Sequence, residues 1–344
     1  MIATATATDE LMIDRFGQRL MLAAPVVAIV PVGDRTAFVL GNGTCSFVAS
    51  DASGIIVDGG CGAILCASAH PDGQSIVVGG DTGRAARVAP DGATGLGNLG
   101  PRWIDHIIAS AASGAIIASV GKEVIVWEKG AKAPSHRFEF PSTVGGLALD
   151  AKGKRLAVAH YGGVSLVYPS SATSGRVNLA WAGSHIACTM RPEGDFVVTG
   201  TQETGLHGWR MPLGTDMMMS GYRGKTRSFS WNRRGKWLAT SGDEKVVIWP
   251  FDGKNGPMGR APLLIGARKV LVTQVAFHPR DDMLAVGYAD GAVALIRIED
   301  DAQMLVERAG GGAITALAWN GAATTLAFGD EDGRAGLLDA AKRG

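Results

Sequence analysis

Histidine is the side chain best suited to acid–base chemistry near neutral pH, and the 344-residue sequence contains seven. His70 and His278 each precede a proline, in AHPDG and FHPRD, at the same position of two similar segments. A residue that recurs together with its neighbours is typical of a turn, so we interpret both as structural. Four other histidines are scattered along the chain, and they converge only if the fold brings distant segments together. We expect structural or surface roles for these as well: His106, His160, His185 and His207.

The other chemical motifs point away from catalysis. The sequence has no Gly-x-Ser-x-Gly elbow, no phosphate-binding loop and no His-Glu-x-x-His pair. The acidic run GDEDG is too short for a calcium loop, and GGDTGRAAR lies between apolar segments rather than before a helix. We therefore predict no catalytic residues, no cofactor and no metal site.

The four cysteines lie inside apolar stretches and lack the spacing of a zinc site, so we expect Cys45, Cys61, Cys66 and Cys188 to pack as small hydrophobic residues. The N-terminus does not have the pattern of a secretory signal, and no apolar run is long enough to cross a bilayer. These features favour a cytoplasmic protein that does not bind membranes.

Internal repetition dominates the rest of the sequence. The segment WNRRGKWLATSGDEKVVIW returns in altered form as FHPRDDMLAVGYADGAVALI and as WNGAATTLAFGDEDGRAGLL. About eight such copies follow one another, most starting roughly 41 residues apart, which is within the range of propeller repeats. Each copy predicts three short strands separated by turn residues, and a fourth apolar segment lies between copies. The whole chain, 1–344, is thus expected to form one all-β domain.

The two chain ends complete this scheme. The last copy has no fourth apolar segment after it, whereas DRFGQRLML precedes the first copy without a unit of its own. An open sheet edge is a liability that ring closure removes. We therefore expect residues 11–22 to form the closing strand of the last unit, and residues 1–10 to be flexible.

The repeats resemble those of WD40 proteins over essentially the whole chain. The matching pieces are WLATSGDEKVVIW, MLAVGYADGAVALI and TLAFGDEDGRAGLLD, in which Asp243, Asp290 and Asp332 fit the turn before the third strand. Gly221-Tyr222 stands where this family often has Gly-His. The copies and the resemblance together predict an eight-bladed WD40-like β-propeller, with seven blades as the alternative.

Such a topology gathers basic and aromatic residues on one face. The loops that join one unit to the next contain Arg102, Trp103, Trp181, Tyr222, Arg223, Lys225, Arg227, Arg268 and Lys269. Turns between second and third strands add Tyr161, Lys245 and Tyr288, whereas Arg233, Arg234 and Lys236 fall on the opposite face. Aromatic residues and arginine are common interface anchors, so this rim suits an acidic peptide or protein. The alternative is ordinary loop charge, with Trp103 and Trp181 packed against neighbours.

The resemblance implies a non-enzymatic scaffold for protein–protein interaction, which we expect to be a monomer. The alternative is a propeller enzyme or small-molecule binder that uses the axial channel. RNA binding is disfavoured because the formal net charge is only +1.

Overall fold

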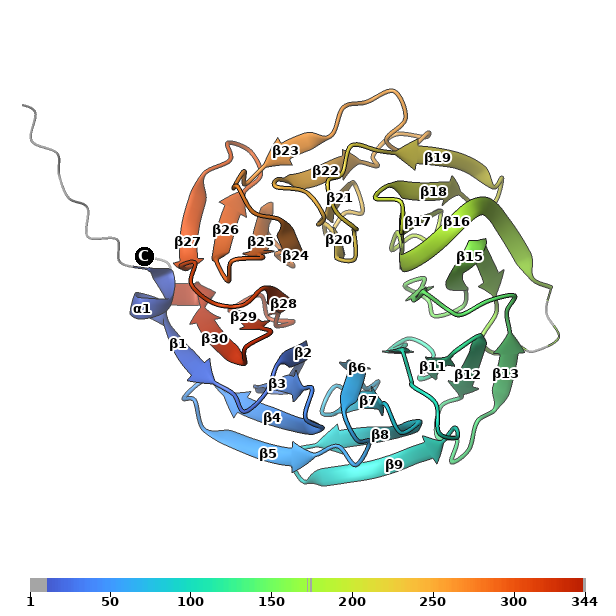
Figure 1. The fold of residues 1–344 in the computed structure, drawn as a ribbon, viewed down its shortest axis with the longest axis horizontal. Helices are drawn as coiled ribbons and strands as arrows, with labels where there is room; N and C mark the ends of the chain where they lie inside the picture. The colour runs from blue at the N-terminus through green and yellow to red at the C-terminus, as the bar shows by residue number, and fades with distance from the viewer. Residues whose placement is uncertain (1–10, 172, 174, 343–344) are drawn as a thin grey trace, which may run out of the picture.

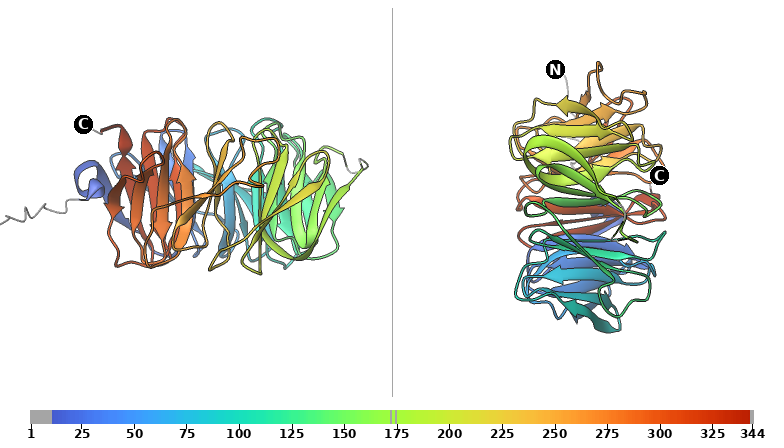
Figure 2. Two further views of the ribbon diagram at one scale, coloured as in Figure 1. Left: turned by 90° about the horizontal axis from the view of Figure 1, so that it is seen from above. Right: turned by 90° about the vertical axis from the view of Figure 1, so that its right-hand side faces the viewer.

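The computed structural model describes residues 11–171, 173 and 175–342. In this part of the chain nearly every regular element is a β-strand, and the strands form antiparallel sheets arranged in a ring (Figure 1). Seen from the side, the ring is a flat disc (Figure 2). The fold is therefore an all-β propeller.

In the first three sheets the strands lie side by side in chain order, from the centre of the ring outwards. These sheets contain β2 (Val26–Val32), β3 (Arg35–Leu40), β4 (Thr44–Ala49) and β5 (Gly54–Asp58); β6 (Ile64–Ala69), β7 (Ile76–Gly80), β8 (Arg84–Ala89) and β9 (Gly92–Asn98); and β10 (His106–Ala109), β11 (Ile116–Val120), β12 (Glu123–Trp127) and β13 (His136–Glu139).

The second half of the ring follows a sheet of six strands. That sheet contains β14 (Gly146–Leu149), β15 (Leu156–Val167), β16 (Val177–Met190), β17 (Phe196–Thr201), β18 (Leu206–Arg210) and β19 (Thr215–Met219). The next two contain β20 (Phe229–Trp231), β21 (Trp237–Thr240), β22 (Val246–Pro250) and β23 (Leu263–Ile265); and β24 (Val272–Phe277), β25 (Met283–Tyr288), β26 (Val293–Arg297) and β27 (Gln303–Glu307). The last contains β28 (Ile314–Trp319), β29 (Thr325–Asp330), β30 (Arg334–Asp339) and β1 (Gly17–Met21).

The six-stranded sheet corrects the expected blade count. Two repeat units join in it because β15 continues through its own turn, bending where Gly162 and Gly163 adopt positive φ. In the same way β16 pairs with β15 in its first half and with β17 in its second half. When each hydrogen-bonded sheet is counted as one blade, the described ring has seven blades. The expectation of eight separate blades is therefore wrong, and the alternative of seven blades is confirmed.

The N-terminus closes the ring. Strand β1 is the outer strand of the last sheet and pairs antiparallel with β30, from Gly17 opposite Leu338 to Met21 opposite Arg334. The stretch expected to form this strand, 11–22, is strand only over 17–21, because Met12–Phe16 form the short helix α1. Leu11 and Ile13 are buried and pack in the cluster that also contains residues of β26 and β29. The described residues end in the 3-10 helix η1 (Ala340–Lys342), and the expectation for residues 1–10 lies outside the described part of the chain.

The hydrophobic core is divided among the spaces between neighbouring sheets. Along β22, Val246 and Ile248 pack against the following sheet, whereas Val247 and Trp249 pack against the preceding one. Each buried aliphatic side chain contributes roughly 1.5–3 kcal/mol before the loss of chain entropy. A sheet therefore needs both neighbours, which makes stability a property of the ring. Among the described residues, no helix has the length and apolar character to cross a membrane.

Candidate interaction face

The antiparallel order of the strands sorts the loops onto two faces. Successive strands of a sheet reverse direction, so the loops between sheets lie on the same face as the turns between second and third strands. All nine predicted site residues belong to loops between sheets or to the corresponding bend of β16. We call this surface the interaction face and the other surface the opposite face.

Three aromatic side chains on the interaction face are exposed. Trp103, in the loop between β9 and β10, and Tyr161, at the bend of β15, are each 65% exposed. The backbone N–H of Tyr161 donates to Ser142 Oγ (2.8 Å), which fixes the bend to the preceding loop. Trp181 is 37% exposed and stacks on the buried His207 ring, with ring centroids 3.8 Å apart. The alternative in which Trp103 packs against its neighbours therefore does not apply, whereas Trp181 is half covered.

Tyr222 is an exception, because it is buried rather than presented to solvent. Its ring is only 8% exposed, its hydroxyl lies 2.7 Å from Thr240 Oγ1, and it accepts a hydrogen bond from Trp249 Nε1 (2.7 Å). Thr240 Oγ1 donates in turn to the carbonyl of Val247, and burial raises the pKa of Tyr222. Tyr222 thus ties its loop to β21 and β22 and offers little surface to a partner. The sequence indicated this structural role only through the dipeptide Gly221-Tyr222, which stands where WD40 repeats often have Gly-His.

Half of the predicted basic residues are neutralised by acidic neighbours. Arg102 pairs with Glu123 at 2.8 Å, and Arg223 pairs with Glu244 at 2.9 Å. These ion pairs sit on exposed loops, where each contributes little stability.

Arg268 is also neutralised, by an ion pair with Asp290 at 3.3 Å, and its guanidinium lies 5.0 Å from the ring centroid of Tyr288. Tyr288, which was expected to reach the interaction face, is fully buried beneath it. The positive charge of Arg268 is therefore shared between a carboxylate and a buried aromatic ring, and little of it is left for a partner.

The remaining predicted basic residues form no ion pair that would offset their positive charge. Lys225, Arg227 and Lys269 are exposed and make no ion pair with any residue that the structure describes. Burial and then the charge of Arg227 lower the pKa of His106, which lies on β10 in a different sheet. Lys245, in the adjacent turn, is exposed as well.

The histidines are built into turns and sheets. The ring nitrogens of His70 and His278 accept backbone N–H groups of the turns that follow them, as predicted. His185 bonds Thr199 Oγ1 (2.7 Å), and His160 bonds Ser165 Oγ (2.9 Å), inside the six-stranded sheet. Burial lowers the pKa of His207 to about 4.

The part of the chain that the structure describes contains neither a cluster of metal ligands nor a disulfide. No group of three or more His, Cys, Asp or Glu side chains there is arranged to hold a metal ion. The four cysteines are free; Cys45 and Cys61 are buried and Cys66 and Cys188 partly so, which fits the predicted packing role.

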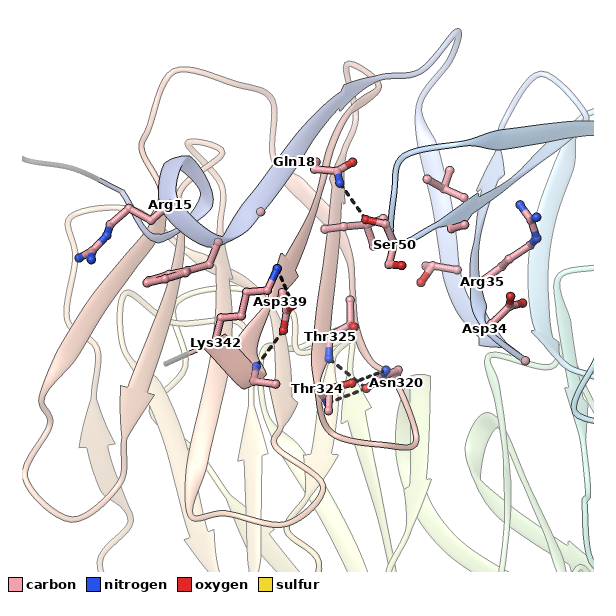
Figure 3. Close-up of a pocket in the computed structure, with 18 residues that line it drawn as sticks. Arg15, Gln18, Asp34, Arg35, Ser50, Asn320, Thr324, Thr325, Asp339 and Lys342 are labelled. Carbon is pink, nitrogen blue, oxygen red and sulfur yellow. Dashed lines mark hydrogen bonds and ion pairs between the residues drawn. The ribbon is translucent and has the colours of Figure 1, made fainter. Parts of the chain in front are cut away.

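A polar cavity of about 550 Å³ lies on the opposite face, between the last and first sheets. Asp34, in the turn after β2, and Arg35, at the start of β3, lie across it from Asp339 and Lys342 (Figure 3). Gln18 crosses its wall and donates to the carbonyl of Ser50 (2.8 Å). Since this cavity contains none of the predicted site residues, it is separate from the interaction face.

The architecture defines a β-propeller, and comparison with known proteins gives its type. Residues 216–250 match the family model described as "WD domain, G-beta repeat", a segment that runs from β19 to β22 and contains the Tyr222–Thr240–Trp249 network. The chain is a WD40-type β-propeller.

Comparison with solved structures supports the fold. The computationally designed protein Ika8 superimposes with a TM-score of 0.77 at 15% sequence identity, over 93% of this chain and 98% of that one. At this identity the likeness is one of fold. A search of curated proteins finds no match.

Proposed function

We propose that this protein is a non-enzymatic scaffold that binds a partner protein through its interaction face. The supporting observation is the combination of a largely exposed Trp103 with Lys225, Arg227 and Lys269, which lack ion pairs among the described residues. A largely exposed aromatic ring supplies contact area, and cations without ion pairs attract acidic groups and speed association. The partner surface is accordingly acidic with an apolar pocket for the indole ring.

The rigid ring suits this role. The loops are held at both ends by strands whose residues are buried between sheets, so little backbone order has to be gained on binding. The free cysteines are consistent with a reducing compartment, and we propose that the protein acts in the cytoplasm as a monomeric single domain.

Affinity capture followed by mass spectrometry tests the proposal. The interaction-face variant carries Trp103→Ser, Lys225→Glu and Lys269→Glu. The matched control carries Arg233→Glu, Arg234→Glu and Lys236→Glu, which remove three exposed cations from the turn between β20 and β21 on the opposite face. We expect the first variant to lose captured proteins at least tenfold and the control to keep them. Equal capture by both variants, with unchanged circular dichroism spectra, would refute the interaction face.

A further inference from the structure

A second cavity of about 550 Å³ lies between the last two sheets on the interaction face, beneath the loop Arg308–Gly312. Apolar side chains form its floor, among them Leu20, Ile314 and Phe328. Three arginines, Arg19, Arg308 and Arg334, also line it, together with the carboxylates of Glu307 and Asp330. Its size is within the range of small-molecule sites, and its apolar floor with a few charged groups is their usual composition.

The repeat explains why this space is open. The register that pairs Phe229 with Thr240 in one sheet pairs Leu317 with Phe328 in the last sheet, and this places Gly310 at the position of Tyr222. In the same way, His185 pairs with Thr201 as Ile314 pairs with Asp330, so that Trp181 also corresponds to Gly310. Gly146 pairs with Ala159 as Ala316 pairs with Gly329, so Phe140 corresponds to Gly310 as well. Three other repeats therefore carry an aromatic ring at this position, and the last repeat carries no side chain.

The neighbouring repeat fills the same space by another route. Its register pairs Val272 with Tyr288, so Tyr288 corresponds to Asp330. The Tyr288 ring is fully buried and its hydroxyl donates to the carbonyl of Gly266 (2.8 Å). An aromatic ring with a polar end thus fits the space. In the last repeat the two positions that supply such a ring elsewhere are occupied by Gly310 and Asp330, which have no ring.

Another glycine at this position has the same consequence. Ile64 pairs with Gly80 as Ile314 pairs with Asp330, so Gly60 corresponds to Gly310, and Gly60 lines a separate cavity of about 440 Å³. A third repeat pairs His106 with Ser119 as the last repeat pairs Ala316 with Gly329, which places Gly100 at this position, and Gly100 lines neither cavity. A cavity therefore lies beside this glycine in two of these three repeats.

The charged groups that line the larger cavity indicate which kind of polar group a ligand would carry. Asp330 is 2% exposed, burial raises its pKa, and its Oδ1 accepts the backbone N–H groups of Asp332 (2.9 Å) and Arg334 (2.8 Å). Arg19 is already paired with Asp14 and Glu307. The Arg334 side chain is exposed, donates to the carbonyl of Gly310, and has no ion pair among the described residues. Arg308 also lines the cavity but already interacts with another residue, which leaves Arg334 as the arginine that can pair with an anionic group.

We propose that this cavity is a binding site for a small aromatic carboxylate, whose ring takes the place that Tyr222 occupies in its own repeat and whose carboxylate pairs with Arg334. This inference is independent of the proposed protein partner, because it concerns a different set of side chains.

The test uses two probes that differ only in charge, 4-hydroxyphenylacetate and its neutral amide, 4-hydroxyphenylacetamide. The acid combines the phenol ring of tyrosine with one carboxylate. A ligand of this size binds with a Kd on the order of 0.1–1 mM, and a charge-assisted bond to Arg334 favours the acid by about tenfold. Binding is measured by titration calorimetry and by ligand-observed NMR on the whole chain.

Two variants and one control decide the result. Ala309→Trp places an indole at the cavity wall and should weaken binding of both probes at least tenfold, whereas Ala267→Trp, at the corresponding position of the preceding repeat, should not. Arg334→Gln should abolish the preference for the acid while the amide binds as before. No saturable binding of the acid below about 10 mM overturns the proposal. So does a preference for the acid that survives Arg334→Gln, or equal binding by the two tryptophan variants.

Discussion

The hydroxyl of Tyr222 is a single group whose removal tests the account of how each loop is fixed to its sheet. In Tyr222→Phe the ring still fills its space, but Trp249 Nε1 loses its acceptor in a site where the indole is only 8% exposed. A buried donor left unpaired costs about 1–3 kcal/mol. The lost bond to Thr240 adds about 0.5–1.5 kcal/mol, since Thr240 keeps its bond to the carbonyl of Val247. The expected loss of unfolding free energy is about 2–4 kcal/mol.

Urea unfolding followed by tryptophan fluorescence measures this loss. Tyr161→Phe is the matched control, because its side chain is exposed, and it should change stability by less than about 0.5 kcal/mol. A double-mutant cycle with Trp249→Phe isolates the hydroxyl–indole bond, and the coupling should be about 1–2 kcal/mol. If Tyr222→Phe proves as stable as the control, or the coupling energy is zero, the Tyr222 hydroxyl does not fix the loop to its sheet.

Three further predictions concern closure, titration and packing. Deletion of residues 1–22 exposes the edge of β30 and should abolish cooperative thermal unfolding, whereas deletion of 1–10 should not; equal melting curves would contradict closure by β1. His207 has its folded pKa lowered to about 4 by burial, so the stability it contributes is present above its unfolded value of about 6.5 and is lost as the pH falls toward 4. His207→Phe should therefore flatten the pH dependence of stability in this window by about 3 kcal/mol, and an unchanged slope would argue against it. Gly200→Ala places a methyl group against the backbone carbonyl of Thr226, in the loop before β20, and should cost about 1–3 kcal/mol in urea titrations, whereas Gly95→Ala meets open space; equal losses would contradict the packing.

Repetition in the sequence was enough to predict the architecture. The apolar segments of WLATSGDEKVVIW became β21 and β22, and every residue of β22 is buried because both faces of the strand meet another sheet. The missing fourth strand of the last repeat correctly pointed to a segment before the first repeat. The length of this closing strand was not predictable, because the sequence of residues 12–16 is compatible with a helix as well as with a strand. Their packing against β27 decides between the two.

The interaction face was harder to predict, because sequence assigns a residue to a loop but not the direction of its side chain. Tyr222 and Arg223 are neighbours, yet one is buried against Trp249 and the other is exposed beside Glu244. The blade count failed for a related reason. Gly162 and Gly163 read as a turn between strands, but their positive φ values let β15 bend and continue, so that two repeats share one sheet.

Departures from the repeat carry more functional information than the repeat itself. At one loop position the ring carries Trp181, Tyr222, Arg268 and Gly310 in four repeats. The tyrosine fills the space between sheets, the tryptophan half covers it, and the arginine lies over a buried tyrosine. Beside the glycine is a cavity lined by its neighbours Ala309 and Gly311 and by Arg334. The space between sheets is filled by an apolar cluster in each case, although the residues that form the cluster differ from one repeat to the next. A WD40-type ring can thus change what a loop presents without losing the packing that closes it, and single positions such as Gly310 are where new binding sites can arise in a chain of this fold.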